Sequence, residues 1–157
     1  MDKLIGSVIR IDGRDYLIHE KLSETLKDEL REEWVVYEAT FPNDNAIHKS
    51  TRRYALKVRY GRRPRGISET RLAVTEALAK RFYNGECRAL SISSKSGYTP
   101  VFYGSEELSS NQNPFFRHGH VWAIAMGLAD GTSLYELSEL SYSDKVIIQE
   151  EMIKALE

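Results

Sequence analysis

The sequence predicts an α+β fold, in which a twisted antiparallel sheet of about five strands packs against one long helix and is followed by C-terminal helices. Three observations support this prediction. Several short segments rich in aromatic and β-branched residues alternate apolar with polar positions, as strands do. Residues 68–93 repeat instead with a helical period, and the last fifteen residues return to that period. With 157 residues, 41% of them hydrophobic, the chain is long enough to bury a core.

The N-terminal third predicts strands with one helical interruption. Apolar residues alternate on both sides of Asp12-Gly13, which is typical of a β-hairpin within residues 4–18. Residues 20–33 carry leucines at a spacing of four, which predicts a short helix. Residues 34–40 and 53–60 are rich in β-forming residues and flank a turn, so we expect two antiparallel strands there.

A long helix is expected at residues 68–93. Ser68 is a typical N-cap, and the acidic Glu69 that follows suits the positive end of the helix dipole. Apolar residues keep the helical period to the end of this segment, although Asn84-Gly85 predicts a kink or a break.

The C-terminal part predicts two more strands and two helices. Strands are expected at 100–104 and 121–128, on either side of a polar loop at 105–114. A short helix is expected over 134–140, and a final amphipathic helix follows, with Ser143 as its cap.

Composition excludes several classes of function. The 22 basic and 23 acidic residues give a net charge of −1, which is unlike a strongly basic nucleic-acid-binding protein. No apolar stretch approaches the roughly 18 residues that a membrane span needs, and no signal peptide is visible, so we expect a cytoplasmic or nuclear protein without membrane contact. The single cysteine, Cys87, forms no internal disulfide. His118 and His120 have no acidic or thiol partner at metal spacing, so we interpret them as loop residues and expect no metal site.

The segment Tyr54-Ala55-Leu56-Lys57-Val58 resembles the Val-Ala-Ile-Lys motif on the third strand of the protein-kinase small lobe. Residues 34–39 look like the strand after the phosphate loop, and residues 68–93 sit where the family has its regulatory helix. Residues 98–104 resemble the fourth strand, and residues 124–134 resemble the fifth strand and the hinge. In this order the segments are similar to the small lobe of eukaryotic-type protein kinases, and particularly to divergent kinase-like proteins of fungi.

The resemblance also implies a division of the chain. Residues 1–130 correspond to a kinase-like small lobe. Residues 131–157 correspond to the helices that follow the hinge and begin a large lobe, which is cut off at Glu157 before the catalytic loop.

By this resemblance Lys57 corresponds to the lysine that pairs the α- and β-phosphates of ATP, and a glutamate on the long helix is its ion-pair partner. Two glutamates are candidates. Glu86 fits the local family pattern of a glutamate followed by an apolar leucine, here Leu90, whereas Glu76 fits the usual distance from the lysine better. We favour Glu86.

The same resemblance implies an adenine site. The backbone carbonyl of Gly127 and the backbone groups of Ala129 would face an adenine edge, and Met126 would limit the depth of the pocket. Ala55 would lie over the adenine, and Val36 belongs to the same nucleotide-binding set.

The glycines of the phosphate-cradling loop are missing. The three glycine positions fall on Glu29, Arg31 and Trp34, so side chains stand where backbone N–H groups need to approach the phosphates. The acids Glu29, Glu32 and Glu33 would place negative charge beside negative phosphate. We therefore expect ATP to bind weakly at most, and we expect no other cofactor.

The 157 residues contain neither the His-Arg-Asp catalytic loop nor the Asp-Phe-Gly metal-binding segment of kinases, so phosphate transfer by this chain as it stands is not expected. The leading hypothesis is a non-catalytic, pseudokinase-like module for protein interaction or regulation. The lower face of a small lobe normally meets the large lobe, and the final helix has an apolar side formed by Val146, Ile147, Met152 and Ile153. A protein partner or a second copy is expected to cover that face.

Two alternatives remain open at this stage. The chain is the nucleotide-binding half of a kinase that another chain or segment completes, against which the loss of the glycine loop counts. Alternatively it binds an anionic ligand or nucleic acid through a basic segment at 52–71, against which the balancing acids count. The cations of this segment are Arg52, Arg53, Lys57, Arg59, Arg62, Arg63, Arg65 and Arg71.

Overall fold

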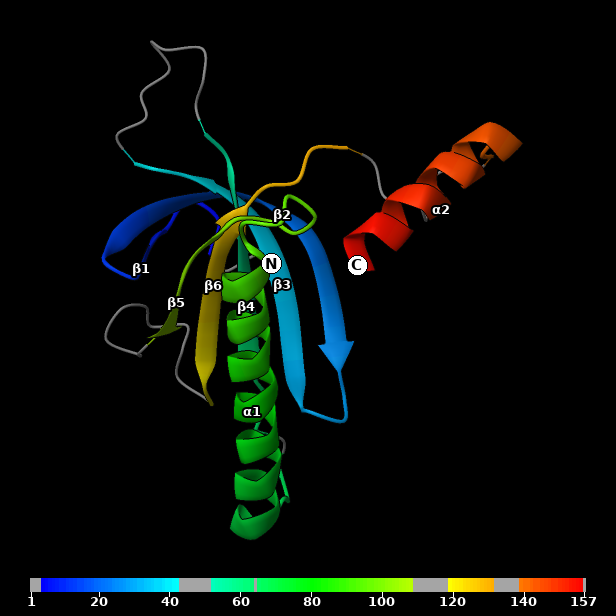
Figure 1. Ribbon diagram of the computed structural model, residues 1–157. Helices are drawn as coiled ribbons and strands as arrows, with labels where there is room; N and C mark the ends of the chain where they lie inside the picture. Colours follow the sequence, from blue (N-terminus) through cyan, green and yellow to red (C-terminus); the bar gives the residue numbers. More distant parts are fainter. Residues whose placement is uncertain (1–3, 43–51, 64, 109–118, 132–138, 157) are drawn as a thin grey trace.

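We describe a computed structural model in which residues 4–42, 52–63, 65–108, 119–131 and 139–156 are placed (Figure 1). These residues form six strands and two helices. The elements are β1 (Val8–Ile11), β2 (Arg14–Lys27), β3 (Glu32–Thr40), β4 (Tyr54–Gly61), α1 (Glu69–Ser93), β5 (Phe102–Leu108), β6 (Val121–Gly127) and α2 (Tyr142–Leu156).

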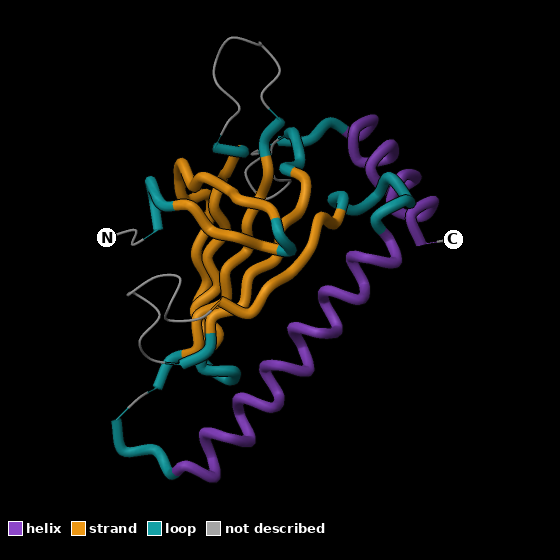
Figure 2. Tube along the Cα trace, turned by 90° about the vertical axis from the view of Figure 1, so that its left-hand side faces the viewer, coloured by secondary structure: helices purple, strands orange, loops and turns teal. Residues whose placement is uncertain are grey.

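The strands form one antiparallel sheet in the order β1-β2-β3-β4-β6-β5. The sheet curls until its two edge strands, β1 and β5, contact each other, so its shape is close to a barrel (Figure 2). The backbone N–H of Asp12, next to β1, donates to Glu106 of β5 at 3.1 Å. The predicted α+β class is confirmed, and the sheet has six strands rather than about five.

The predicted N-terminal hairpin is present. β1 and β2 pair so that Ile11 lies opposite Arg14, which leaves Asp12 and Gly13 as a two-residue turn. Both turn residues have positive φ angles, 49° and 74°, as a type I′ turn requires. This turn matches the right-handed twist of the flanking strands, and it fixes the register of the hairpin.

The helix predicted at 20–33 is wrong. Residues up to Lys27 extend β2, a turn follows, and β3 begins at Glu32. A spacing of four between leucines places them on one side of a helix, but four is also a multiple of the strand period of two. The pairing of β2 along β3 decides between these two conformations, because it satisfies the backbone of both strands over nearly their full lengths.

Apolar side chains pack on both faces of the curled sheet. The enclosed face holds the larger cluster, which consists of Leu4, Ile9, Ile11, Tyr16, Ile18, Val35, Tyr37, Ala39, Tyr54, Leu56, Val58, Leu108, Val121, Ala123 and Ala125. A smaller cluster lies between the other face and α1, and it consists of Leu30, Ala79, Tyr83, Trp122 and Ile124. The second cluster fixes the position of α1 relative to β6 and to the turn between β2 and β3.

Helix α1 has the predicted bounds. Ser68 caps it, since its hydroxyl accepts a hydrogen bond from the N–H of Arg71 at 3.3 Å. The break expected at Asn84-Gly85 is absent, and the helix continues to Ser93. A glycine inside a helix costs only about 1 kcal/mol, which the packing on both sides of it can offset.

The C-terminal part departs from the sequence prediction at two places. β5 continues to Leu108, so the polar loop begins later than expected. The cap of α2 is Ser141 rather than Ser143, because the N–H of Asp144 donates to the Ser141 hydroxyl and the N–H of Ser141 donates to the Asp144 carboxylate. The helix expected at 134–140 falls mostly outside the described residues.

Helix α2 has no buried residue. Neither helix in the described part of the chain combines the length and the apolar character that crossing a bilayer requires.

Candidate functional site

An ion pair joins β4 to α1. The ammonium of Lys57 donates to Oε1 of Glu86 at 2.5 Å, so the predicted contact with Glu86 is present. Glu86 lies three residues after the buried Tyr83, on the side of α1 that faces the sheet. Glu76 does not take this role, because its carboxylate lies 3.4 Å from Nδ1 of His120.

The indole of Trp34 covers the same lysine. Trp34 stands on β3, next to β4, and its ring centroid lies 4.1 Å from the ammonium of Lys57. The lysine side chain is therefore held between a carboxylate and an aromatic face, and 15% of it is exposed. The sequence identified Trp34 as a residue in place of a glycine, but no local signal indicated that its ring would lie over Lys57.

A buried ion pair lies beside this lysine. Arg59 and Glu32 are both fully buried, and Nη2 of the arginine donates to Oε2 of the glutamate at 2.5 Å. Nη2 also donates to the backbone carbonyl of Ala79 on α1 at 3.2 Å, and Nη1 lies 3.6 Å from Oε2 of Glu86. Arg59 therefore connects β3, β4 and α1.

The pairing of Glu32 with Arg59 corrects the expectation that Glu29, Glu32 and Glu33 all place negative charge beside a bound phosphate. The carboxylate of Glu32 is buried against Arg59 and does not add an open negative charge to the site. Glu33 follows on the same strand, so its side chain points to the sheet face opposite to Glu32 and Trp34. Only Glu29, which is exposed in the turn between β2 and β3, remains an open acid of the three.

His120 lies in the loop directly before β6, as its interpretation from sequence expects, but its side chain is packed into the protein. Its side chain is 7% exposed, its ring stacks on Trp122 with 3.7 Å between centroids, and its Nε2 donates to Glu32 at 2.9 Å. Gly119 allows this position, because it has φ of 94° and a Cβ there would lie 2.5 Å from the carbonyl oxygen of Gly61. His118 lies outside the described residues.

The contacts of Glu32 lower its pKa below the ordinary value of 4.5. Burial by itself raises the pKa of this carboxyl, but hydrogen bonds from His120, Arg59 and Trp34 stabilise the charged form and outweigh burial. Since the pKa is lower in the folded state than in the unfolded state, ionised Glu32 stabilises the fold above about pH 4.5. This stabilisation is lost as the pH falls further.

We therefore expect that substituting Glu32→Gln makes the free energy of unfolding depend less on pH in the acidic range. The variant should be less stable than the unmodified protein at pH 7, and the difference should shrink as the pH falls below about 4.5. Urea unfolding at a series of pH values measures it. Glu29→Gln, at an exposed acid, is the control and should leave the profile unchanged; an E32Q profile parallel to that of the unmodified protein would contradict the assignment.

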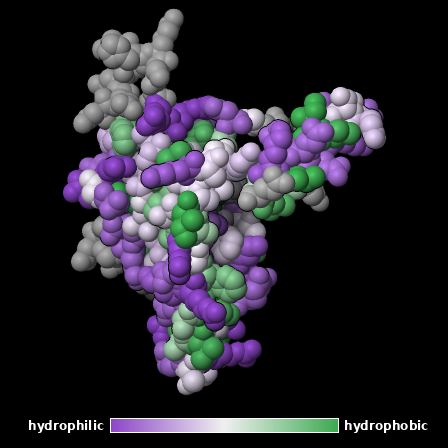
Figure 3. Space-filling model, viewed as in Figure 1, coloured by the Kyte–Doolittle hydropathy of each residue, from purple (hydrophilic) through white to green (hydrophobic). Residues whose placement is uncertain are grey.

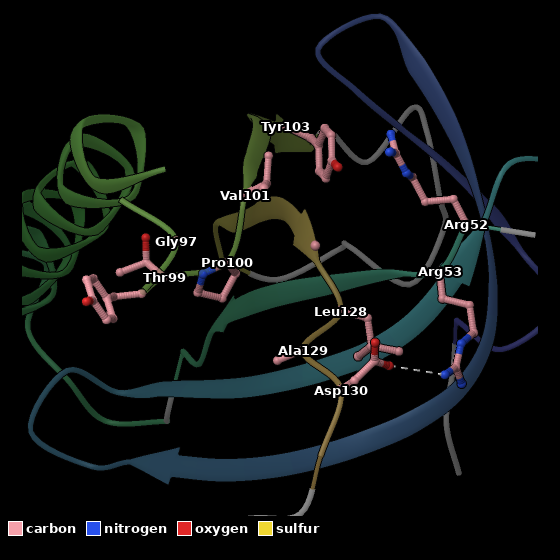
Figure 4. Close-up of a pocket in the computed structure, with 12 residues that line it drawn as sticks. Arg52, Arg53, Gly97, Thr99, Pro100, Val101, Tyr103, Leu128, Ala129 and Asp130 are labelled. Carbon is pink, nitrogen blue, oxygen red and sulfur yellow. Dashed lines mark ion pairs between the residues drawn. The ribbon is translucent and has the colours of Figure 1, made fainter. Parts of the chain in front are cut away.

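Two cavities lie near the predicted site. The first, which we call the helix–sheet cleft, has a volume of about 710 Å³ and is lined by Trp34, Lys57, Arg59, Leu78, Arg81, Phe82, Gly85, Glu86 and Ala89. The second, which we call the hinge cavity, has a volume of about 620 Å³ (Figure 4). It is lined by Arg52, Arg53, Gly97, Tyr98, Thr99, Pro100, Val101, Tyr103, Gly127, Leu128, Ala129 and Asp130.

The nucleotide residues expected from the sequence are divided between these cavities. Lys57 and Glu86 line the helix–sheet cleft, whereas Gly127 and Ala129 line the hinge cavity. Lys57 pairs with Ile124 on β6, and Gly127 lies three residues further along that strand. The positions of Lys57 and Gly127 are therefore about 10 Å apart along the sheet.

The remaining three expected residues, Val36, Ala55 and Met126, lie on strands next to these positions. Val36 is opposite Lys57 in the register, and Met126 is opposite Ala55. Ala55 precedes Lys57 by two residues, so both point to the same face of the sheet. Val36, Ala55, Lys57 and Met126 thus share one face of the sheet, but no single cavity among those described contains all of the predicted residues.

The hinge cavity is polar at its rim. Arg53 contacts Glu38 at 3.3 Å. It also lies 3.7 Å from Asp130, an ion pair drawn as a dashed line in Figure 4. The backbone N–H of Gly127 donates to the carbonyl of Val101 at 2.8 Å, which ties the end of β6 to the segment before β5.

Most of the basic segment is paired with acids. Besides Lys57 and Arg59, the cations Arg53 and Arg62 contact carboxylates of other segments, and Arg63 contacts Glu69 within the segment. The segment therefore does not present one continuous positive surface, although Arg52, Arg65 and Arg71 are exposed. In the described ranges, no three His, Cys, Asp or Glu side chains are grouped so that they could hold a metal ion.

The sequence matches no protein-family model and no curated protein. The kinase resemblance therefore rests on short motifs, on their order in the chain and on the geometry described above.

Proposed function

We propose that this chain contains a protein-kinase-like small lobe that acts as a non-catalytic module in protein interaction or regulation and binds ATP weakly at most. The order of the elements supports the kinase-like part. After the extra strand β1, two strands are followed by the lysine-bearing strand β4, the long helix α1 and two further strands. In protein kinases an ion pair joins the third-strand lysine to the regulatory helix, and here Lys57 and Glu86 make such a contact.

The environment of Lys57 is the observation that favours weak nucleotide binding. Its ammonium lies between the Glu86 carboxylate and the Trp34 ring, and only 15% of the side chain is exposed. A phosphate that approached this lysine would have to displace the indole, and it would meet side chains where a glycine loop offers backbone N–H groups. A phosphate could therefore contact Lys57 only if the lysine lost its existing contact with the Trp34 ring or with Glu86.

Exposed apolar side chains support the interaction part of the proposal. They lie on α1 and α2, and Figure 3 shows apolar surface over both helices. The residues concerned are Val74, Leu78, Phe82 and Ile92 on α1, and Ile147, Met152, Ile153 and Leu156 on α2. Large apolar side chains left exposed on a helix are candidates for contact with other molecules.

Calorimetry with Mg·ATP tests the nucleotide part of the proposal. We expect no measurable heat, or a Kd in the millimolar range, and the same result for Lys57→Met. A micromolar affinity that needs magnesium and is lost in Lys57→Met would contradict the proposal.

Light scattering over a range of concentrations tests the interaction part. We expect a mass above the 18.0 kDa of one chain, and a lower mass after Ile147→Asp and Ile153→Asp are introduced together on α2. A monomer at every concentration would argue against self-association through α2.

One observation favours a second candidate, the nucleotide-binding half of a kinase. Active kinases require the lysine–glutamate pair to be in place, and in this structure it is formed. The calorimetry distinguishes the candidates, because only this one requires magnesium-dependent, micromolar binding of ATP.

A further inference from the structure

The helix–sheet cleft, which contains the Lys57–Glu86 pair of the proposed function, also has the features of a site for a small molecule other than ATP. Its volume of about 710 Å³ falls within the roughly 300–1,000 Å³ that is typical of ligand pockets. Its walls are apolar and aromatic, formed by Trp34 from β3 and by Leu78, Phe82 and Ala89 from α1. Phe82 is 55% exposed and Leu78 is 43% exposed, so these walls face open space in the described structure.

Gly85 keeps the cleft open. It lines the cleft from the middle of α1, and a Cβ at this position would meet no atom within 4 Å. Glycine in a helix interior is destabilising relative to alanine, and here no steric contact of the fold requires it. A larger side chain at position 85 would extend into the cleft.

The charges around the cleft favour an anion. Three cations, Lys57, Arg59 and Arg81, line it together with the carboxylate of Glu86, and the buried carboxylate of Glu32 pairs with Arg59, so one positive charge is in excess. Lys27 adds a further cation at the edge, with its ammonium 5.1 Å from the Trp34 ring centroid.

A buried donor at the base of the cleft points to a ligand acceptor. Arg59 is fully buried, and within the described part of the chain its Nη1 makes no hydrogen bond, although Oε2 of Glu86 lies 3.6 Å away at ion-pair distance. A buried donor without a hydrogen bond is costly, so an incoming oxygen atom at a shorter distance would supply the hydrogen bond that the protein does not.

We propose that the helix–sheet cleft binds a small amphipathic anion, namely a carboxylate carried on an aromatic body. The aromatic body packs between Trp34 and Phe82, in the space opposite Gly85. The carboxylate lies toward Arg81 and the unsatisfied Nη1 of Arg59. This site needs neither a catalytic loop nor a phosphate loop, so it stands whether or not the chain binds ATP.

Binding of 2-naphthoate, followed by the shifts of the Trp34 indole N–H and the Gly85 amide in ¹H–¹⁵N spectra, tests the proposal. The uncharged 2-naphthalenemethanol is the matched probe. We expect 2-naphthoate to bind at least tenfold more tightly, and we expect added salt to reduce this preference. Equal affinity for the two probes, or shifts spread over the whole protein, would overturn the proposal.

Two pairs of variants locate the site. Gly85→Leu should fill the cleft and weaken 2-naphthoate binding at least tenfold while raising the melting temperature, because leucine favours the helix. Asn84→Leu changes helix propensity at the neighbouring exposed position and should leave the affinity unchanged. Arg81→Gln should remove most of the preference for the charged probe, whereas Arg88→Gln, at an exposed arginine of α1 outside the cleft, should retain it. Unchanged binding by Gly85→Leu would place the ligand elsewhere and refute the assignment.

Discussion

Substituting Arg59→Met is expected to lower the free energy of unfolding by about 3–5 kcal/mol, enough to unfold much of a marginally stable domain. Arg59 and Glu32 are both fully buried, and their closest contact is 2.5 Å. Methionine fills much of the same space but leaves the Glu32 carboxylate buried without its strongest partner. The contact with the Ala79 carbonyl is lost at the same time, so α1 also loses a connection to the sheet.

Urea unfolding followed by circular dichroism measures this effect. Arg62→Met is the matched control, because Arg62 pairs with Asp28, whose side chain is 86% exposed, and such surface pairs contribute about 0–1 kcal/mol. The double variant Arg59→Met with Glu32→Met should regain part of the loss, since it leaves no unpaired buried charge. Equal effects of Arg59→Met and Arg62→Met would show that the buried pair does not stabilise the fold.

Features that depend on local sequence were predictable. The turn at Asp12-Gly13 needs residues that tolerate positive φ, and the cap at Ser68 needs a side chain that accepts a backbone hydrogen bond. Each requirement is met by one or two adjacent residues, so both appear in the sequence as recognisable patterns. The contact between Lys57 and Glu86 was predicted differently, from a resemblance that supplied the long-range pairing.

Features that depend on distant partners were not predictable in this way. The leucine spacing in residues 20–33 fits a helix and a strand equally well, and pairing with β3 decides the outcome. Glu32 and His120 are 88 positions apart, so no local pattern indicates that the histidine is buried against that acid. The position of the Trp34 ring over Lys57 likewise depends on the alignment of β3 with β4.

The candidate site depends on how firmly α1 is held against the sheet. Only two residues of this 25-residue helix, Ala79 and Tyr83, are buried. The ring of Tyr83 stacks on Trp122 with 5.1 Å between centroids, and its hydroxyl lies 3.3 Å from the carbonyl oxygen of Ala123. Burial raises the pKa of the Tyr83 hydroxyl, so it remains protonated and can donate to that carbonyl.

Substituting Tyr83→Ala is therefore expected to destabilise the protein by about 3–5 kcal/mol and to release α1 from the sheet. Because Glu86 lies one turn further along the same helix, its ion pair with Lys57 should loosen as well. Thermal unfolding measures the first effect, and faster amide hydrogen exchange along α1 measures the second. Phe82→Ala removes a neighbouring aromatic ring that is 55% exposed, and it should change both measurements little. If the two variants behaved alike, the packing of Tyr83 would not be what holds the helix, and its ion pairs with β4 would have to be the main attachment.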